Sequence, residues 1–264
     1  MSGSLRIGII GGGGWLGGAI AASILDAGLV QPHALSLSYR TEQPNRFEGS
    51  FWTTENQELA DRSDVIIVSV RPADWPPLAV DASGKLLVSV MAGIRLSQLA
   101  EHHNTDRVVR SLPNAAAEVG KSYTPWVASE AVDDRDRFIV RSIFDACGTA
   151  DEVASEDNID YLTGLSGSGP AFPALLAAAM KNDAIAHGIC PDVASRAVTA
   201  VLIGAGRLFE RRDECPASVV ETFLSYRGTT AAAIESMRAA GFEAAIASGL
   251  AAALKKSVRM GESS

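Results

Sequence analysis

A run of glycines near the N-terminus has the spacing of a phosphate-binding turn. The pattern Gly-x-Gly-x-x-Gly at 12–17 lies between the apolar run 5–10 and the start of a helical pattern. Glycines in this register permit a tight turn, and backbone N–H groups at the start of the helix attract a pyrophosphate. The alternative is a glycine-rich turn without a ligand. The predicted cofactor contacts here are Gly12, Gly14, Trp15, Leu16 and Gly17.

The residues that follow the second strand-like run, 34–39, indicate which dinucleotide binds. A site that prefers NAD places an Asp or Glu there for the ribose 2′-hydroxyl. The sequence has Ser38, Tyr39 and Arg40 and no acid at this point. The planar guanidinium of Arg40 can pair with a 2′-phosphate, and Ser38 can add a hydroxyl. We expect NADP(H) as the cofactor; the alternative is that Arg40 is a solvated loop residue.

A second glycine-rich stretch, LSGSGPAF at 165–172, directly precedes an apolar helical run. Its serines can cap that helix, and its glycines allow close approach of a ligand. Metal chemistry has no support in the sequence, because the three cysteines have no metal-ligand spacing and the four histidines fall in no shared motif. We expect no metal site and reduced cysteines.

The elements that must position these residues fall into two groups. Strand-like runs at 5–10, 34–39, 64–70, 85–92 and 106–112 alternate with helical or loop segments, which predicts a parallel α/β sheet. After Ala150 the sequence is almost entirely helical, with helices expected over 173–188, 191–210, 217–225 and 228–258. The fold class is α/β: a Rossmann-like NADP-binding domain over 1–155, followed by an all-α dimerisation domain over 156–264, whose small residues on several helix faces suggest burial against a second subunit. The family resemblance described below adds substrate binding to this second domain.

Composition excludes several classes of partner. The chain has 264 residues and a formal net charge of -8, which argues against nucleic acid or an anionic membrane as the main partner. No apolar run is long enough to span a bilayer, and the N-terminus lacks the pattern of a signal peptide. Together with the reduced cysteines, these features predict a cytoplasmic protein.

Several motifs in a fixed order resemble those of the pyrroline-5-carboxylate reductase family. They are the glycine turn, Val70-Arg71-Pro72 where the family has Val-Lys-Pro, SVMAGI at 89–94, RSLPNAAAEVG at 110–120, LSGSGPAF at 165–172 and SYRGTT at 225–230. The resemblance runs almost from end to end. It implies NADPH-dependent reduction of the C=N bond of a cyclic imine carboxylate, 1-pyrroline-5-carboxylate to proline, by a homodimer or higher homo-oligomer.

The resemblance also implies roles for individual residues. It adds Val70, Arg71, Pro72, Ala92 and Gly93 to the cofactor site. It assigns the substrate carboxylate to the SYRGTT turn, where backbone N–H groups open a helix and favour an anion. The implied substrate contacts are Asn114, Ser225, Arg227, Gly228, Thr229 and Thr230, and the implied catalytic residues are Thr230 and Ser168. A protonated imine is already electrophilic, so such an enzyme mainly positions its substrate and excludes water.

Departures from the family pattern leave three alternatives open. The family's Ser-Pro-Gly-Gly-Thr-Thr is SYRGTT in this chain, and Pro-Asn-Thr-Pro-Ala is PNAAA at 113–117. Because of these changes, one alternative is that the chain is a related imine reductase that acts on another cyclic imine. The role of Arg227 is also open: its side chain either pairs with the substrate or points into solvent. A non-catalytic NADP-binding protein is a second alternative. A β-hydroxyacid dehydrogenase is disfavoured, because its catalytic Lys would fall at Pro173.

Overall fold

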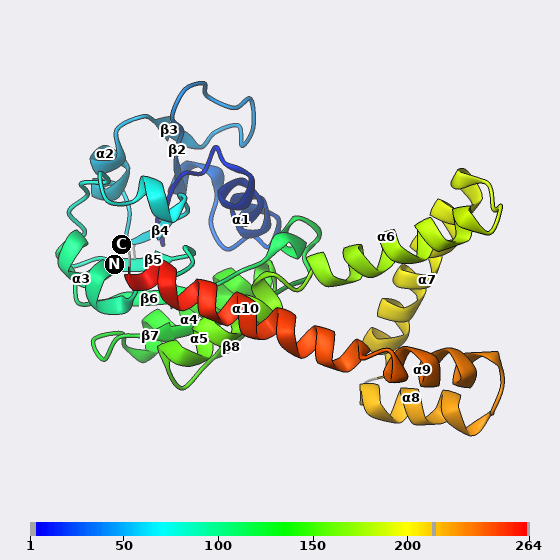
Figure 1. Cartoon of the computed structure of the whole chain (residues 1–264). Helices are drawn as coiled ribbons and strands as arrows, with labels where there is room; N and C mark the ends of the chain where they lie inside the picture. The colour runs from blue at the N-terminus through cyan, green and yellow to red at the C-terminus, as the bar shows by residue number, and fades with distance from the viewer. Residues whose placement is uncertain (1–3, 213–214, 263–264) are drawn as a thin grey trace. The chain divides into compact units, whose positions relative to one another are not determined.

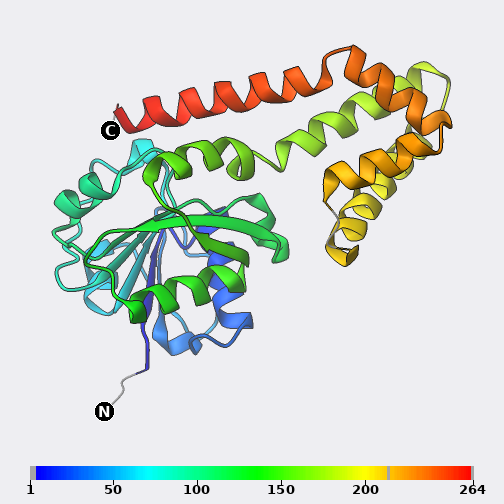
Figure 2. The same ribbon diagram turned by 90° about the horizontal axis from the view of Figure 1, so that it is seen from below.

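The computed structural model describes residues 4–212 and 215–262 (Figure 1 and Figure 2). The chain divides into two compact units, which are described separately. The first unit contains Met1–Ser168 and Ala252–Ser264, and the second contains Gly169–Ala251. The first unit continues to Ser168, whereas the domain boundary was predicted after residue 155. That domain boundary stays a prediction.

The first unit is built on one eight-stranded sheet. Its strands are β1 (Ile7–Ile10), β2 (Leu35–Ser38), β3 (Phe51–Thr53), β4 (Val65–Val68), β5 (Leu86–Ser89), β6 (Val108–Ser111), β7 (Ser122–Ala128) and β8 (Gly148–Glu152). The strand order is β3-β2-β1-β4-β5-β6-β7-β8, and every neighbouring pair is parallel except β6 and β7. The predicted parallel α/β sheet is therefore confirmed.

Three of these strands were not predicted. β3 has only three residues, which is too short for an alternating pattern to appear. β7 contains Pro125, a residue that argues against a strand, and β8 is mostly exposed. These strands form because they add to neighbouring strands, and their own sequences carry little strand signal.

Helices cover both faces of this sheet. They are α1 (Trp15–Asp26), α2 (Asn56–Asp61), α3 (Leu96–His103), α4 (Asp134–Ala146) and α5 (Glu156–Leu162). Along β4, Val65 and Ile67 belong to one buried cluster, which contains residues of α1 and α4. Ile66 and Val68 belong to a second cluster, with residues of α2 and α3. The strand alternates between two cores, so its uninterrupted apolar run is explained by burial on both faces.

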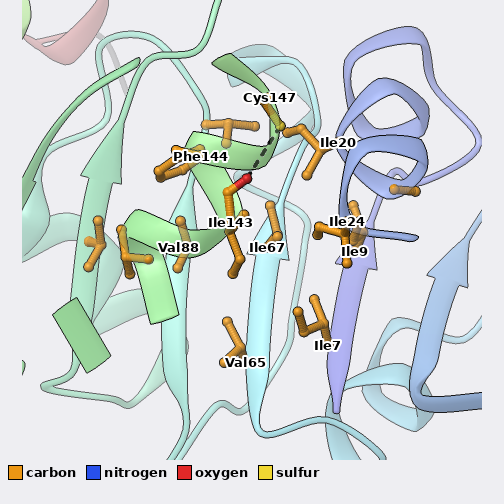
Figure 3. Packing of buried hydrophobic residues seen from close by; sticks show 14 of the residues in the cluster. Ile7, Ile9, Ile20, Ile24, Val65, Ile67, Val88, Ile143, Phe144 and Cys147 are labelled. Atoms are coloured by element: carbon orange, nitrogen blue, oxygen red, sulfur yellow. Dashed lines mark hydrogen bonds between the residues drawn. The ribbon is translucent and has the colours of Figure 1, made fainter. Parts of the chain in front are cut away.

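The core on the α1 side is drawn in Figure 3. Ile20 and Ile24 of α1 and Phe144 of α4 are completely buried there against the strands. The Sγ of Cys147 lies 3.5 Å from the carbonyl oxygen of Ile143, as the dashed line marks. Burial raises the pKa of the Cys147 thiol, so this cysteine acts as a small apolar core residue.

A buried ion cluster joins the later part of the chain to the sheet of the first unit. The guanidinium of Arg110 on β6 is 1% exposed and pairs with Asp160 at 2.6 Å and Glu156 at 3.1 Å. The hydroxyl of Ser257 on α10 (Phe242–Glu262) donates to the same carboxylate of Asp160 at 3.0 Å. A charge this deeply buried requires such partners, and here they fix α5 and the end of α10 to the sheet.

The second unit consists of helices. They are α6 (Ala171–Ala186), α7 (Pro191–Arg212), α8 (Pro216–Ser225), α9 (Thr229–Ala239) and the first part of α10. The helix expected over 228–258 is two helices, because Gly241 with φ +85° breaks it after α9. The other expected helices are confirmed to within a few residues.

Large apolar side chains are exposed on these helices. Leu175 is 72% exposed, Ile203 is 60% exposed and Val201 is 54% exposed.

No single helix among the described residues is long and apolar enough to cross a membrane. The pair Thr229–Ala239 and Phe242–Gly261 meets that test only when the two are taken together across a bend of 52°.

Candidate dinucleotide site

A pocket of the first unit lies at the carboxyl ends of β1, β2 and β4 and has a volume of about 890 Å³. β1 stands between β2 and β4 in the sheet, so the strand order reverses at this point. Open α/β sheets bind their ligands at such a switch point. Eight of the predicted cofactor residues line the pocket: Gly14, Trp15, Leu16, Ser38, Tyr39, Arg40, Val70 and Arg71.

The glycine turn at the floor of the pocket depends on a residue that the motif did not include. Gly11 has φ +80°, and a Cβ there would lie 2.3 Å from the carbonyl oxygen of Ser69. Only glycine fits this position. A Cβ on Gly17 would lie 2.5 Å from the oxygen of Gly11, so Gly17 permits the close approach of α1. The signal for Gly11 was present in the sequence, because it directly follows the strand.

Ser38 supports this turn from β2. Its hydroxyl oxygen accepts a hydrogen bond from the amide of Gly11 at 3.0 Å, and its carbonyl accepts one from Gly13 at 3.0 Å. The residue is 3% exposed. The predicted contact between Ser38 and a 2′-phosphate stays a prediction.

The N-terminus of α1 opens toward the pocket through Gly14, its N-cap, which provides no side-chain cap. The first amides of the helix are therefore available to an anionic ligand. Trp15, the first helical residue, is 54% exposed, and its indole N–H donates to Glu118 at 3.1 Å. Glu118 belongs to the short helix η3 (Ala115–Val119), so this bond ties the glycine turn to the segment after β6.

Two arginines and two acids line the pocket wall beside β2 and β4. The side chain of Arg40 is 77% exposed, and its Nη2 lies 2.9 Å from Oδ2 of Asp74. Arg71 is exposed, and its guanidinium has no ion-pair or hydrogen-bond partner among the described residues. Glu42 is the second acid. The glycine turn, the open helix end and the two cations fit a phosphorylated dinucleotide.

Other predicted cofactor residues do not line this pocket. They are Gly12, Gly17, Pro72, Ala92 and Gly93. Gly93 has φ +84°, and a Cβ there would lie 2.7 Å from Cβ of Met260 on α10. A Cβ on Gly261 would lie 2.5 Å from the oxygen of Gly93. The two glycines therefore allow α10 to pack closely on the loop after β5, and packing accounts for Gly93.

Asn114 and Ser168 are both engaged within the first unit. The side-chain oxygen of Asn114 accepts from the amide of Ala116 at 2.9 Å, and its amide group donates to the carbonyl of Ser166 at 2.9 Å. Ser168 donates from Oγ to the carbonyl of Thr163 at 3.2 Å. Asn114 thus caps η3 and holds the SGSG segment in place.

The expectation that serines cap the helix after SGSGPA is wrong. The N-cap of α6 is Pro170, without a side-chain cap. Ser166 and Ser168 donate back to carbonyls of the preceding turn, within a π-helical segment over Thr163–Gly167. A single turn of π-helix often marks a functional segment, and here it absorbs the hydroxyls that were expected at the helix start.

The SYRGTT turn lies in the second unit, at the start of α9. Gly228 is the N-cap and provides no side-chain cap, and Thr229 and Thr230 are exposed in the first turn. Ser225 donates to the carbonyl of Thr222 at 2.8 Å. Arg227 has φ +51°, in the left-handed region that favours glycine. The open helix start is able to hold an anion.

A buried histidine fixes the segment that carries Asp74. The indole N–H of Trp75 donates to Nε2 of His103 at 2.9 Å, so the ring proton resides on Nδ1, which donates to the carbonyl of Val80 at 2.9 Å. His103 is completely buried, and this burial lowers its pKa below the ordinary value. The imidazole is therefore neutral. It anchors Trp75, the residue after Asp74, but does not itself line the pocket.

No group of three or more His, Cys, Asp or Glu side chains that could hold a metal ion is found within residues 4–212 and 215–262. Cys147, Cys190 and Cys215 are free thiols.

Comparison with known proteins identifies relatives along the whole chain. Residues 156–260 match the family described as pyrroline-5-carboxylate reductase dimerisation, and residues 6–93 match that described as NADP oxidoreductase, coenzyme F420-dependent. The pyrroline-5-carboxylate reductase of Thermus thermophilus is 30% identical over 255 residues, which cover 95% of this chain and 97% of that protein. That of Synechocystis is 29% identical over 272 residues, covering 98% and 99%.

Solved structures show the same fold. A pyrroline-5-carboxylate reductase from Coxiella burnetii has a TM-score of 0.89 at 24% identity and covers 98% of this chain and 99% of its own. The Plasmodium falciparum pyrroline carboxylate reductase with NADP bound has a TM-score of 0.83 at 24% identity, covering 97% and 98%.

Proposed function

The chain belongs to the pyrroline-5-carboxylate reductase family, and we propose that it reduces 1-pyrroline-5-carboxylate to proline with NADPH. The observation that carries this proposal is the pocket at the β1 switch point, where a glycine turn that admits no Cβ at Gly11 meets the exposed cation Arg40. This arrangement supports the binding of a dinucleotide with an additional phosphate.

The residues of the first unit hold the cofactor. The amides of Trp15 and Leu16 face its pyrophosphate, the glycine turn lets that group approach the backbone, and Arg40 pairs with its 2′-phosphate. Bound NADPH supplies a hydride, which adds to the carbon of the protonated C=N bond and leaves a secondary amine. The protein has to orient the imine and exclude water, which agrees with the few ionisable side chains in the predicted motifs.

The start of α9 holds the substrate carboxylate in this proposal. The amides of Gly228, the N-cap, and of Thr229 and Thr230 lie at the start of a helix of 11 residues, where the helix dipole favours an anion. The hydroxyl of Thr230 donates to the substrate at the same end. Arg227, one residue earlier, adds a positive charge to the site. Ser168 and Asn114 support the segment that leads to α6.

The chain forms a homo-oligomer through its helical part, and we infer that it is a homodimer. The exposed large apolar residues of α6 and α7 support burial against a second copy, since burial removes their apolar surface from water. We also infer a cytoplasmic location, which is supported by the three free cysteines.

A panel of cyclic imines tests the activity. Oxidation of NADPH is followed with 1-pyrroline-5-carboxylate, with its six-membered homologue and with a pyrroline that lacks the carboxylate, each repeated with NADH. The proposal requires the highest kcat/KM with 1-pyrroline-5-carboxylate and NADPH. A higher value with another imine would identify a related imine reductase, and no turnover with any imine would leave only cofactor binding.

A further inference from the structure

We propose that Asp74 is a specificity-determining residue for the cofactor: it competes with the 2′-phosphate for Arg40 and thereby limits the preference for NADPH over NADH. This inference rests on the role proposed above for Arg40. It is carried by the ion pair between the two side chains, 2.9 Å from Nη2 to Oδ2, in the wall of the dinucleotide pocket.

The ion pair uses the group that the 2′-phosphate needs. A carboxylate and a phosphate both bind guanidinium through its N–H donors, and both are anions. A phosphate that reaches Arg40 must displace the carboxylate of Asp74 or bind beside it against charge repulsion. NADH has a neutral 2′-hydroxyl at this position and meets neither cost.

The two partners differ in how firmly they are held. Asp74 is the last residue of the short helix η2 (Pro72–Asp74), where its amide donates to the carbonyl of Arg71 at 2.9 Å. The next residue, Trp75, is 4% exposed and is anchored by His103. The Asp74 side chain is 36% exposed, whereas the Arg40 side chain is 77% exposed. Arg40 is therefore the partner that moves, and Asp74 stays at the pocket wall.

The remaining charges of the pocket do not replace Arg40 in this pair. Arg71 is a second cation in the lining, but it has no ion-pair partner within residues 4–212 and 215–262. Glu42 is a second acid, and it makes no hydrogen bond or ion pair in the same part of the chain. Glu42 therefore provides a matched control: its substitution removes one negative charge from the same pocket without releasing Arg40.

Binding of NADP⁺ and NAD⁺ to the purified protein, measured by isothermal titration calorimetry without imine, tests the proposal. We expect Asp74→Asn to lower the Kd of NADP⁺ about 5- to 30-fold and to change that of NAD⁺ less than about 2-fold, because the pair is partly exposed. Glu42→Gln should strengthen NADP⁺ binding less than Asp74→Asn does. In an Arg40→Gln background, Asp74→Asn should lower the Kd of NADP⁺ by about 3-fold or less, because there is no Arg40 guanidinium for the substitution to release.

Each other outcome overturns the proposal. Weaker NADP⁺ binding in Asp74→Asn would mean that the carboxylate positions Arg40 for the phosphate. Equal gains for both cofactors, or an equal gain in Glu42→Gln, would indicate a general charge effect. A full gain in the Arg40→Gln background would indicate direct repulsion. Arg40→Gln alone should weaken NADP⁺ far more than NAD⁺; if it does not, the proposed role of Arg40 fails, and turnover of the imine panel tests the proposed reaction independently.

Discussion

Arg227 occupies a backbone position that glycine would fill at lower cost, directly before the proposed carboxylate site. It follows the end of α8 with φ +51°, and its amide donates to the carbonyl of Leu224 at 3.1 Å. This is the position after a helix where glycine is most common. The Arg227 guanidinium has no hydrogen-bond or ion-pair partner among the described residues. We therefore expect Arg227 to be retained for its charge and to cost stability.

The magnitude follows from the backbone conformation. An L-residue in the left-handed region is destabilised by roughly 1–2 kcal/mol relative to the right-handed one. Glycine avoids this cost but adds roughly 0.5–1 kcal/mol of unfolded-state entropy. Arg227→Gly should therefore raise the free energy of unfolding by about 0.5–1 kcal/mol. Arg227→Ala keeps the left-handed strain and should change it by less than about 0.5 kcal/mol.

Urea unfolding of the two variants at one fixed protein concentration measures this difference, since an oligomer's stability depends on concentration. In the imine assay both variants should raise KM for the carboxylate-bearing substrate about 10- to 100-fold and leave the pyrroline without a carboxylate unaffected. A glycine variant no more stable than the alanine variant would refute the strain argument. An unchanged KM would show that the Arg227 side chain is solvated and does not contact the carboxylate.

Three further results are expected. Thr230→Val should lower kcat/KM for 1-pyrroline-5-carboxylate and leave the Kd of NADPH unchanged, because its hydroxyl serves the substrate; normal turnover would place the substrate site elsewhere. The pKa of His103 is lower in the folded protein than in the unfolded chain, so below pH 6.5 the unfolded chain binds the proton more readily. The contribution of His103 to the free energy of unfolding is therefore complete above pH 6.5 and is lost as the pH falls below that value. The decrease in urea midpoint between pH 7.5 and pH 5.5 should therefore be smaller in His103→Gln than in the parent protein, whereas the exposed control His187→Gln should keep the full decrease. Light scattering at micromolar concentration should give at least the mass of a dimer, and a monomer mass would contradict the proposed interface.

The sequence alone determined the elements whose signal is local. The apolar strand runs, the glycines that follow β1 and most of the proline and glycine breaks between helices each act within a few residues, so their patterns predicted the parallel sheet and the helical part. The break at Gly241 was missed, because the helical pattern continues on both sides of it. Arg40 stood out because a position after the second strand required either an acid or a cation. Gly11 could have been predicted in the same way, because it directly follows the first strand. It was missed because four glycines stand in a row and the motif was placed on Gly12, Gly14 and Gly17.

The tertiary structure alone decided which residues far apart in the chain contact one another. The Arg40–Asp74 pair, the Trp15–Glu118 hydrogen bond and the close approach of Gly93 to Gly261 each join segments that sequence periodicity treats as independent. The same holds for β3, β7 and β8, which are strands because a neighbouring strand supplies their hydrogen bonds. Such pairings depend on where the backbone places two residues in space, and that placement follows from the packing of both faces of the sheet.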